Sequence, residues 1–316
     1  MDHSPPLAIE ADGHRTTFGK TVAIDDLTIE CRTGEVTAIL GPNGAGKSTF
    51  VRMIATLTRP DAGSLRVCGV DAVAHAADVR RLIGLAGQSA AVEPALTGRE
   101  NLVMVAKLFG HRRRAAESAA DSVLGEVGLA DDGGRLVREY SGGMRRRLDL
   151  AASLVGAPRV LLLDEPTTGL DPRTRMDLWD SVRSLVANGT DVLLTTQYLE
   201  EADQLADRVV IIDHGRVIAN GSPLELKTQS GRDVIVVTLN RPVDQGMAMQ
   251  ALHAVSTDEP AYDPVAKTVR AAVDDGPTAL SHVLADLAAA NVRIDDIALR
   301  RPTLDEVFLA LTGDPQ

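Results

Sequence analysis

A glycine-rich segment that begins at Gly41 has the residue types that bind a phosphate chain. Gly41 and Gly46 frame this segment, and Lys47 and Ser48 follow directly. Glycines let successive backbone N–H groups turn toward phosphate oxygens, lysine is a mobile cation, and a serine hydroxyl can bind Mg²⁺. We therefore predict a nucleotide phosphate site over consecutive residues, namely Gly41, Pro42, Asn43, Gly44, Ala45, Gly46, Lys47, Ser48 and Thr49.

An acidic pair further along the chain could complete a hydrolytic site. Asp164 and Glu165 directly follow the leucines of residues 161–163. We predict that Asp164 holds Mg²⁺, directly or through water. Glu165 could polarise an attacking water as the general base. These residues alone leave kinases, GTPases and helicases open.

Apolar segments predict the elements that must position these residues. Residues 36–40 are typical of a buried strand that leads into the glycine-rich segment, and alternation from about residue 7 to 37 favours antiparallel strands. The helix after the segment is predicted to have one apolar face, formed by Phe50, Met53, Ile54 and Leu57. Further buried strands are predicted at residues 160–163, 192–195 and 209–212. Strands separated by helices predict a mostly parallel sheet and an α/β fold.

The character of the sequence changes near residue 228, so we predict two domains, residues 1–228 and 229–316. The second domain is expected to contain, in order, a strand at 234–239, a helix at 247–255, a hairpin at 262–273, a helix at 278–290 and a strand at 292–299. That β-α-β-β-α-β order predicts a small α+β domain of ferredoxin-like fold. A last helix is predicted to begin at Thr303, in a capping box with Glu306. This domain carries no chemical motif, so we assign it to dimer contacts or regulation.

Composition excludes several classes of protein. The chain has 316 residues, of which 44% are hydrophobic and 24% are charged, as in an ordinary globular protein. Its net charge of −11 lacks the positive footprint of nonspecific nucleic-acid binding. The N-terminus has no signal-peptide pattern, and no apolar run approaches the roughly 18 residues of a spanning helix. We expect a cytoplasmic protein in which Cys31 and Cys68 are free thiols.

Two short basic runs, residues 112–114 and 145–147, have no aromatic residues interleaved with them. In a chain of negative net charge, we interpret both runs as solvated helix faces. Contacts to partner loops or to anionic lipid headgroups are the alternative. We predict no nucleic-acid partner.

Residues 140–145, Tyr-Ser-Gly-Gly-Met-Arg, resemble the signature of ATP-binding-cassette (ABC) ATPases. Other motifs of that family stand in the family's order. Phe18 precedes a glycine, Gln88 resembles the glutamine loop, and residues 166–171 resemble the exit of the Walker B strand and the D-loop. The similarity covers about residues 7–226. It implies a P-loop ABC ATPase core with an antiparallel β subdomain and a helical subdomain at about residues 89–150.

The resemblance also implies roles for individual residues. Phe18 would stack on adenine, and Gln88 would touch Mg²⁺ or the lytic water. The implied catalytic residues are Glu165, Gln88, Gln197 and Lys47, and the implied Mg²⁺ ligands are Ser48, Gln88 and Asp164. Besides the P-loop, ATP would contact Phe18, Gln88, Ser141, Gly142, Gly143 and Asp171. In this family the signature binds a γ-phosphate on the opposite subunit, so an ATP-driven homodimer is expected.

Two positions depart from the family's pattern. Met144 replaces the usual glutamine of the signature, and its neighbours make the phosphate contact. Gln197 stands where the family has its switch histidine. A glutamine can donate a hydrogen bond to the γ-phosphate but carries no proton or positive charge. We predict that hydrolysis is slower than in a histidine enzyme and lacks a pH dependence from this position.

The loop at residues 197–203 and the ending at residues 299–309 are similar to those of the daunorubicin/doxorubicin-resistance (Drr-type) exporter ATPases. This resemblance extends over the whole chain. It implies an ATPase subunit for antibiotic or multidrug efflux, at the cytoplasmic face of the membrane, with a membrane permease on a separate chain. Export of a lipid or polysaccharide is the first alternative, because an ATPase subunit does not contact the cargo.

A second alternative, from another class, is a non-transport ABC ATPase that acts on ribosomes or DNA. The chain has one cassette, whereas translation factors of that kind usually have two. The interval between Lys47 and Ser141 lacks the heptads of the long coiled coil found in DNA-repair members. A regulatory module with residual nucleotide affinity is a third reading, supported only by Gln197.

Overall fold

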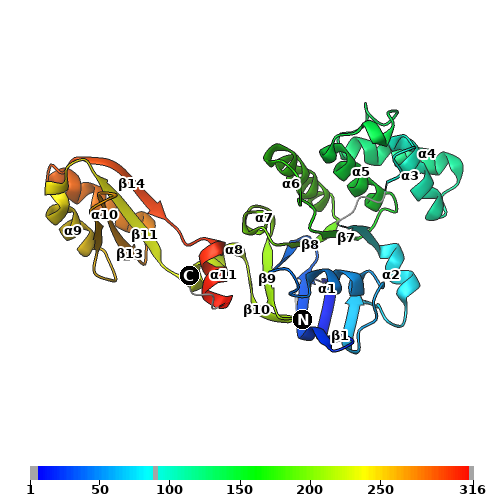
Figure 1. Cartoon of the computed structure of the whole chain (residues 1–316), viewed down its shortest axis with the longest axis horizontal. Coiled ribbons are helices and arrows are strands. Elements are labelled where there is room, and N and C mark those ends of the chain that lie inside the picture. The colour runs from blue at the N-terminus through cyan, green and yellow to red at the C-terminus, as the bar shows by residue number, and fades with distance from the viewer. Residues whose placement is uncertain (1–5, 88–91, 313–316) are drawn as a thin grey trace. The chain divides into compact units, whose positions relative to one another are not determined.

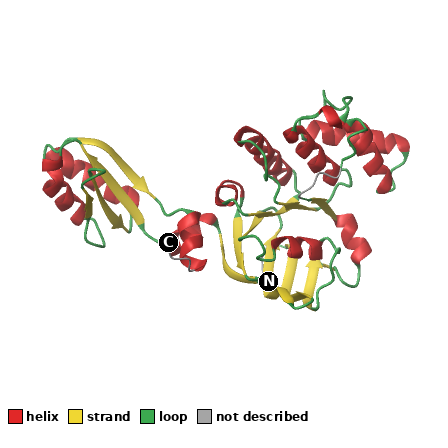
Figure 2. Cartoon of the chain, viewed as in Figure 1, coloured by secondary structure: helices red, strands yellow, loops and turns green. Residues whose placement is uncertain are grey.

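The computed structural model describes residues 6–87 and 92–312, in two compact units, Met1–Pro223 and Leu224–Gln316 (Figure 1). Both units combine helices with strands (Figure 2). Helix α8 (Pro223–Ser230) begins at the division, so the boundary expected after residue 228 falls inside this helix. Within the described ranges, no helix is long and apolar enough to cross a membrane.

The N-terminal strands form an antiparallel sheet in the order β2-β1-β4-β5. The strands are β1 (Leu7–Phe18), β2 (Thr21–Arg32), β4 (Ala62–Val67) and β5 (Val70–Asp71). Ile24, Leu27 and Ile29 of β2 are buried. Cys31 and Cys68 are free thiols, as predicted, and burial raises the pKa of Cys31 to about 12.

The larger sheet has the strand order β10-β9-β3-β8-β7-β6, and its neighbours are parallel except for β10 against β9. The strands are β3 (Val36–Leu40), β6 (Ile83–Ala86), β7 (Val160–Asp164), β8 (Asp191–Thr196), β9 (Arg208–Asp213) and β10 (Arg216–Gly221). Every residue of β3, β7 and β8 is buried, as their continuous apolar sequences predict. Parallel pairing places the C-terminal ends of these three strands at one edge. Gly41, Glu165 and Gln197 follow directly there.

Helix α1 (Lys47–Ile54) buries Phe50, Met53 and Ile54 against the sheets. The prediction that Leu57 shares this face is wrong, because the side chain of Leu57 is 60% exposed. The helix ends at Ile54, and Thr56 adopts a left-handed conformation with φ of 59°. This reversal turns the chain before Leu57 can continue the buried face.

The remaining helices of this unit follow the chain order. They are α2 (Ala76–Leu82), α3 (Gly98–Leu108), α4 (Arg113–Glu126), α5 (Gly142–Leu154), α6 (Pro172–Ala187) and α7 (Leu199–Leu205), with a short 3₁₀ turn at Val137–Glu139. Helices α3, α4 and α5 pack on one another as a helical subdomain (Figure 1). Thr97 and Glu100 form a capping box at the start of α3.

The C-terminal unit has the predicted β-α-β-β-α-β order. Its elements are β11 (Asp233–Leu239), α9 (Gln245–His253), β12 (Ala261–Asp263), β13 (Thr268–Val273), α10 (Gly276–Ala289) and β14 (Ile294–Arg300), with a 3₁₀ turn at Pro242–Asp244. The sheet is antiparallel in the order β12-β13-β11-β14, and α9 and α10 cover the face that holds Ile235 and Val237. Helix α11 (Leu304–Thr312) follows, and the predicted capping box of Thr303 and Glu306 is present.

Glu201 of α7 is fully buried and gives a stability prediction. The indole Nε1 of Trp179 donates to its Oε1 at 3.1 Å, and burial raises the pKa of this carboxyl. Ionisation therefore destabilises the folded chain, and this loss of stability sets in as the pH rises from the unfolded pKa of about 4.3 through the higher folded pKa. Glu201→Gln keeps an acceptor for Trp179 without the charge. We expect it to match the native chain near pH 4 and to melt about 2–4 °C higher near pH 8.

Differential scanning calorimetry across that pH range measures this difference. Glu200→Gln is the matched control, because Glu200 is the preceding residue and its side chain is 70% exposed in an ion pair with Arg175. The control should track the native chain at every pH. A difference between Glu201→Gln and the native chain that does not change with pH would contradict the assigned cause.

Candidate active site

The glycine-rich segment is a loop between the end of β3 and the start of α1, and its two framing glycines are sterically required. A Cβ on Gly41 would lie 2.2 Å from the carbonyl oxygen of Ile212. Gly46 has φ of 108°, and its Cβ would lie 2.6 Å from the carbonyl oxygen of Ala23. The loop is therefore held between β2 and β9, and it leads directly into the start of α1, where the helix dipole favours an anion.

A cavity of about 220 Å³ opens at this loop. Its lining residues are Ala23, Asn43, Gly44, Gly46, Lys47, Ser48, Thr49 and Glu165. Most of the predicted phosphate-binding segment, together with the predicted general base, therefore shares one cavity. Ala23 of β2 also lines the cavity, and sequence reasoning did not select it.

Lys47 is the cation of this cavity. Its Nζ donates to the carbonyl oxygens of Gly41 at 2.8 Å and Pro42 at 3.1 Å, and it lies 3.6 Å from Oε1 of Glu165. The side chain is 4% exposed, and burial lowers the pKa of Lys47 despite the opposing pull of Glu165. The ammonium thus binds carbonyl oxygens of the loop, and a phosphate oxygen could replace these bonds.

Asp164 accepts two hydroxyl hydrogen bonds at the same edge of the sheet. Ser48 Oγ donates to its Oδ1 at 3.0 Å, and Thr195 Oγ1 donates to the same atom at 2.6 Å. Hydroxyl and carboxylate oxygens are the donors that Mg²⁺ prefers, and this ion usually takes few protein ligands and completes its shell with phosphate and water. Among the described residues there is no cluster of three or more His, Cys, Asp or Glu side chains that could hold a metal ion by itself. Ser48 and Asp164 are instead the small ligand set that suits Mg²⁺.

Glu165 occupies a strained turn directly after β7. Its φ is 49°, in the left-handed region, and its N–H donates to the carbonyl oxygen and to Oγ1 of Thr195, both at 3.1 Å. Its carboxylate faces Lys47 and accepts from Thr168 Oγ1 at 3.4 Å. Thr195 therefore contacts both acidic residues. Sequence reasoning missed this role, although the threonine directly follows the apolar residues 192–194 of a buried strand.

Phe18 and Gln197 do not line the cavity. Phe18 ends β1, and its side chain is 53% exposed beside the hairpin that leads through β2 to Ala23. Gln197 directly follows β8, whose last residue, Thr196, pairs with Leu40 of β3. Gln88, predicted to contact Mg²⁺ or water, falls outside the described residues.

The signature residues do not line this cavity either. Ser141 is the N-cap of α5 and accepts from the N–H of Met144 at 3.2 Å, and Ser141 and Gly142 are exposed. A Cβ on Gly143 would lie 2.4 Å from Cγ2 of Thr174 in α6. Asp171 caps α6, because it accepts from Thr174 N and Thr174 Oγ1, and the bond from the Thr174 N–H lowers the pKa of Asp171.

The interpretation of residues 145–147 as a solvated helix face is wrong for Arg146. Its side chain is 11% exposed, whereas Arg145 is exposed. The Arg146 guanidinium donates to the backbone carbonyls of Gly87, Glu165 and Pro166, which follow the ends of β6 and β7. A run of three arginines on a helix places each side chain in a different direction, so only one of them need face the core.

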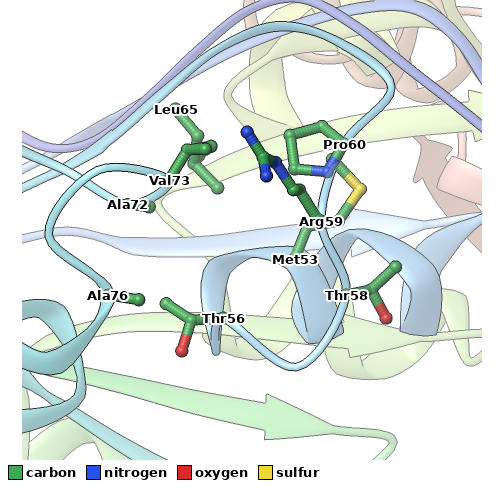
Figure 3. A pocket seen from close by; sticks show the side chains of 9 residues that line it. All are labelled: Met53, Thr56, Thr58, Arg59, Pro60, Leu65, Ala72, Val73 and Ala76. Carbon is green, nitrogen blue, oxygen red and sulfur yellow. The ribbon is translucent and has the colours of Figure 1, made fainter.

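A second cavity of about 190 Å³ lies at the C-terminal end of α1 (Figure 3). It is lined by Met53, Thr56, Thr58, Arg59, Pro60, Leu65, Ala72, Val73 and Ala76. This set contains no carboxylate, thiol or imidazole. The P-loop cavity is therefore the better candidate for chemistry.

Comparison with known proteins agrees with this site. Residues 24–168 match the ABC transporter family, and residues 221–312 match the C-terminal domain of DrrA1-3-like ATP-binding proteins. The chain is 52% identical to the daunorubicin resistance ATP-binding protein DrrA3 of Streptomyces coeruleorubidus, over 97% of this chain and 96% of the relative. It is 50% identical to the daunorubicin/doxorubicin resistance ATP-binding protein DrrA of Streptomyces peucetius, over 100% and 95%, and 38% identical to the Nod factor export ATP-binding protein I of Paraburkholderia xenovorans, over 98% of each.

Solved structures show the same fold. The ATP-binding subunit of an ABC transporter superposes with a TM-score of 0.63 at 27% identity, over 71% of this chain and 92% of that one. The cbiO1 protein of Clostridium perfringens, part of an ABC transporter complex, has a TM-score of 0.66 at 24% identity, over 70% and 90%. With a P-loop cavity lined by Glu165 directly after β7, and with relatives of this identity along its whole length, the chain belongs to the ATP-binding proteins of the ABC transporter family and is an ATPase.

Proposed function

We propose that the chain is the ATP-hydrolysing subunit of an exporter that removes antibiotic-type drugs from the cell. One observation carries this proposal. The 52% identity to a daunorubicin resistance ATP-binding protein spans 97% of the chain, so it includes the C-terminal unit as well as the ATPase unit. The match of residues 221–312 to a C-terminal domain of the same protein group supports it.

We assign the site residues the roles that the family resemblance implies, and the contacts around the P-loop support the assignments of the residues that line or border the cavity. The loop and Lys47 bind the phosphates of ATP, and Phe18 stacks on the adenine. Ser48 and Asp164 hold Mg²⁺, which neutralises developing charge on the phosphates when it is bound. Glu165 is the general base, and Gln197 donates a hydrogen bond to the γ-phosphate.

The working unit is a homodimer. Ser141 and Gly142 are exposed and are not among the residues that line the P-loop cavity of the same chain. Their position at the N-terminus of α5 is suited to bind an anion supplied by another molecule. A second copy that presents ATP to this surface would use both sites at once, and a nucleotide that contacts both copies favours the closed state.

The chain acts at the cytoplasmic face of the membrane, through a permease on a separate chain. No helix of the described part of the chain could span a membrane. The family to which the chain belongs is that of transporters, which supports this assignment.

Affinity purification from detergent-solubilised membranes of the native host tests this proposal. Tagged native chain and Glu165→Gln are compared, with Lys47→Met as the control that should not form the ATP-bound dimer. We expect a multispanning membrane protein to copurify, most strongly with Glu165→Gln in ATP, and daunorubicin to accumulate in cells that lack the chain. Copurified ribosomes or DNA, or no membrane protein with any variant, would contradict the proposal.

A different cargo is the second candidate. The relative from Paraburkholderia xenovorans is named for Nod factor export and is 38% identical over 98% of this chain. A membrane partner that copurifies while daunorubicin efflux is unchanged in the deletion strain would favour this candidate over drug export.

Because residue 197 is a glutamine, we predict that ATP turnover shows no inflection with pH from the titration of a histidine at this position. Because a glutamine does not titrate, the native chain should show no change of turnover from this position between about pH 5 and 8. Gln197→His places a group with an ordinary pKa of about 6.5 beside the γ-phosphate. We expect this variant to hydrolyse ATP several times faster than the native chain at the pH where the histidine is favoured, with a new inflection near its pKa.

Phosphate release measured at saturating ATP across this pH range checks the prediction. Gln204→His, which lies in α7 seven residues after Gln197, is the control, and its profile should match that of the native chain. An unchanged rate and profile for Gln197→His would place residue 197 outside the site.

A further inference from the structure

One buried guanidinium joins three segments of the ATPase unit. Arg146 Nε donates to the carbonyl oxygen of Pro166 at 2.7 Å, and its Nη2 donates to that of Glu165 at 3.2 Å. Its Nη1 donates to the carbonyl oxygen of Gly87 and lies 3.6 Å from Oδ2 of Asp149, one turn further along α5. The planar fork of an arginine suits such a set of convergent acceptors.

The acceptors follow the strands β6 and β7 beside the proposed base, whereas the donor lies on α5, the helix that begins in the signature. Glu165 and Pro166 form the turn after β7, and Gly87 follows β6, the strand paired with β7. Arg146 lies in the second turn of α5, which begins after the N-cap Ser141. A single side chain therefore fixes the distance between the start of the signature helix and the turn that carries the proposed base.

That turn needs external support. Glu165 has φ of 49°. A residue other than glycine keeps this left-handed backbone conformation only where surrounding contacts hold it. Thr195 holds the N–H of Glu165, and Arg146 holds its carbonyl oxygen. Together these bonds fix the two peptide groups that flank the Glu165 Cα and so fix the direction of the carboxylate.

We propose that Arg146 is a positioning residue that sets the orientation of Glu165 from the signature helix. When a phosphate binds at Ser141 and its neighbours, it fixes the position of α5. The hydrogen bond from Arg146 then fixes the position of the Glu165 carbonyl oxygen relative to α5. Occupancy of the signature surface by one subunit's ATP thereby affects hydrolysis at the other subunit's ATP. This inference rests on the proposed role of Glu165 and on the proposed homodimer.

Removal of the guanidinium separates catalysis from binding. In the full-length chain with MgATP, we expect Arg146→Gln to lower kcat by about ten- to a hundredfold and to change KM by less than about threefold. Cooperativity in ATP should fall as well. Arg146→Lys can reach one carbonyl at a time and should restore part of kcat. Arg147→Gln is the matched control, because Arg147 donates to the carbonyls of Val127 and Gly128, both at 3.4 Å, and should keep kcat within about threefold.

A double variant distinguishes positioning from general damage. If Arg146 acts through the base, Arg146→Gln adds little to the loss already caused by Glu165→Gln, whereas independent damage adds in full. Native turnover in Glu165→Gln would refute the proposed function itself. With Glu165→Gln inactive, native kcat in Arg146→Gln would overturn the inference, and so would parallel losses of kcat and ATP affinity. Failure of both Arg146 variants to fold, with Arg147→Gln folded, would make Arg146 a structural residue and would also overturn it.

Discussion

The Glu165→Gln chain is expected to bind ATP and to hydrolyse it at least about a hundred times more slowly than the native chain. The amide has nearly the size of the carboxylate but cannot accept a proton from water. The change also removes the negative charge that lies 3.6 Å from Lys47 Nζ, so the ammonium becomes more available to the nucleotide. ATP affinity should therefore stay equal or rise, and the ATP-bound dimer should accumulate.

Phosphate release gives the turnover, and size-exclusion chromatography with MgATP gives the fraction of dimer. Glu200→Gln removes one exposed carboxylate that pairs with Arg175, and it should leave both measurements at native values. Rapid hydrolysis by Glu165→Gln would show that another group activates the water.

The second large effect concerns Lys47. We expect Lys47→Met to weaken ATP binding by about a hundredfold, because the methionine keeps much of the apolar stem and lacks the charge that meets the phosphates. The loss should exceed that of a surface lysine for two reasons. The side chain of Lys47 is 4% exposed, so its charge acts in a site with little water. Removal of this charge also leaves the Glu165 carboxylate without the cation 3.6 Å away while an anionic ligand binds beside it.

Lys47 also predicts a pH dependence of binding. Burial lowers the pKa of Lys47, so its charge is lost at a lower pH than that of an ordinary lysine. ATP affinity of the native chain should fall as the pH rises through this lowered pKa, and Lys47→Met should lack that fall. Isothermal titration with ATP at several alkaline pH values measures both effects. Lys107→Met, at an exposed position of α3, is the control, and equal affinities for native chain and Lys47→Met would exclude Lys47 from the site.

Local patterns predicted the parts of this molecule whose information is contiguous. The P-loop, the buried strands that precede Gly41 and Glu165, and the capping box at Thr303 each lie within about a dozen residues. The end of a strand and the start of a helix then determine where the residues of each motif lie. The strand and helix order of the C-terminal unit was predictable for the same reason, since each element has its own apolar period.

Other features depend on partners far away in the chain. Arg146 is one of three adjacent arginines, and only the carbonyls of Gly87, Glu165 and Pro166 distinguish it. Thr195 meets Asp164 across 31 positions. A composition rule applied to residues 145–147 averages over side chains that point in different directions, and it therefore gave a surface where the structure has a buried charge.

The backbone conformation of Glu165 makes thermal stability and ATP hydrolysis favour different residues at this position. With φ of 49°, this residue adopts a conformation that costs a side-chain-bearing residue about 1–2 kcal/mol and costs glycine almost nothing. Glycine or asparagine at position 165 would thus relieve the chain of steric energy and delete its base in the same step. A directed-evolution campaign on this chain that selected only for survival at high temperature would drift toward such residues, and its winners would be heat-resistant proteins that hold ATP without hydrolysing it.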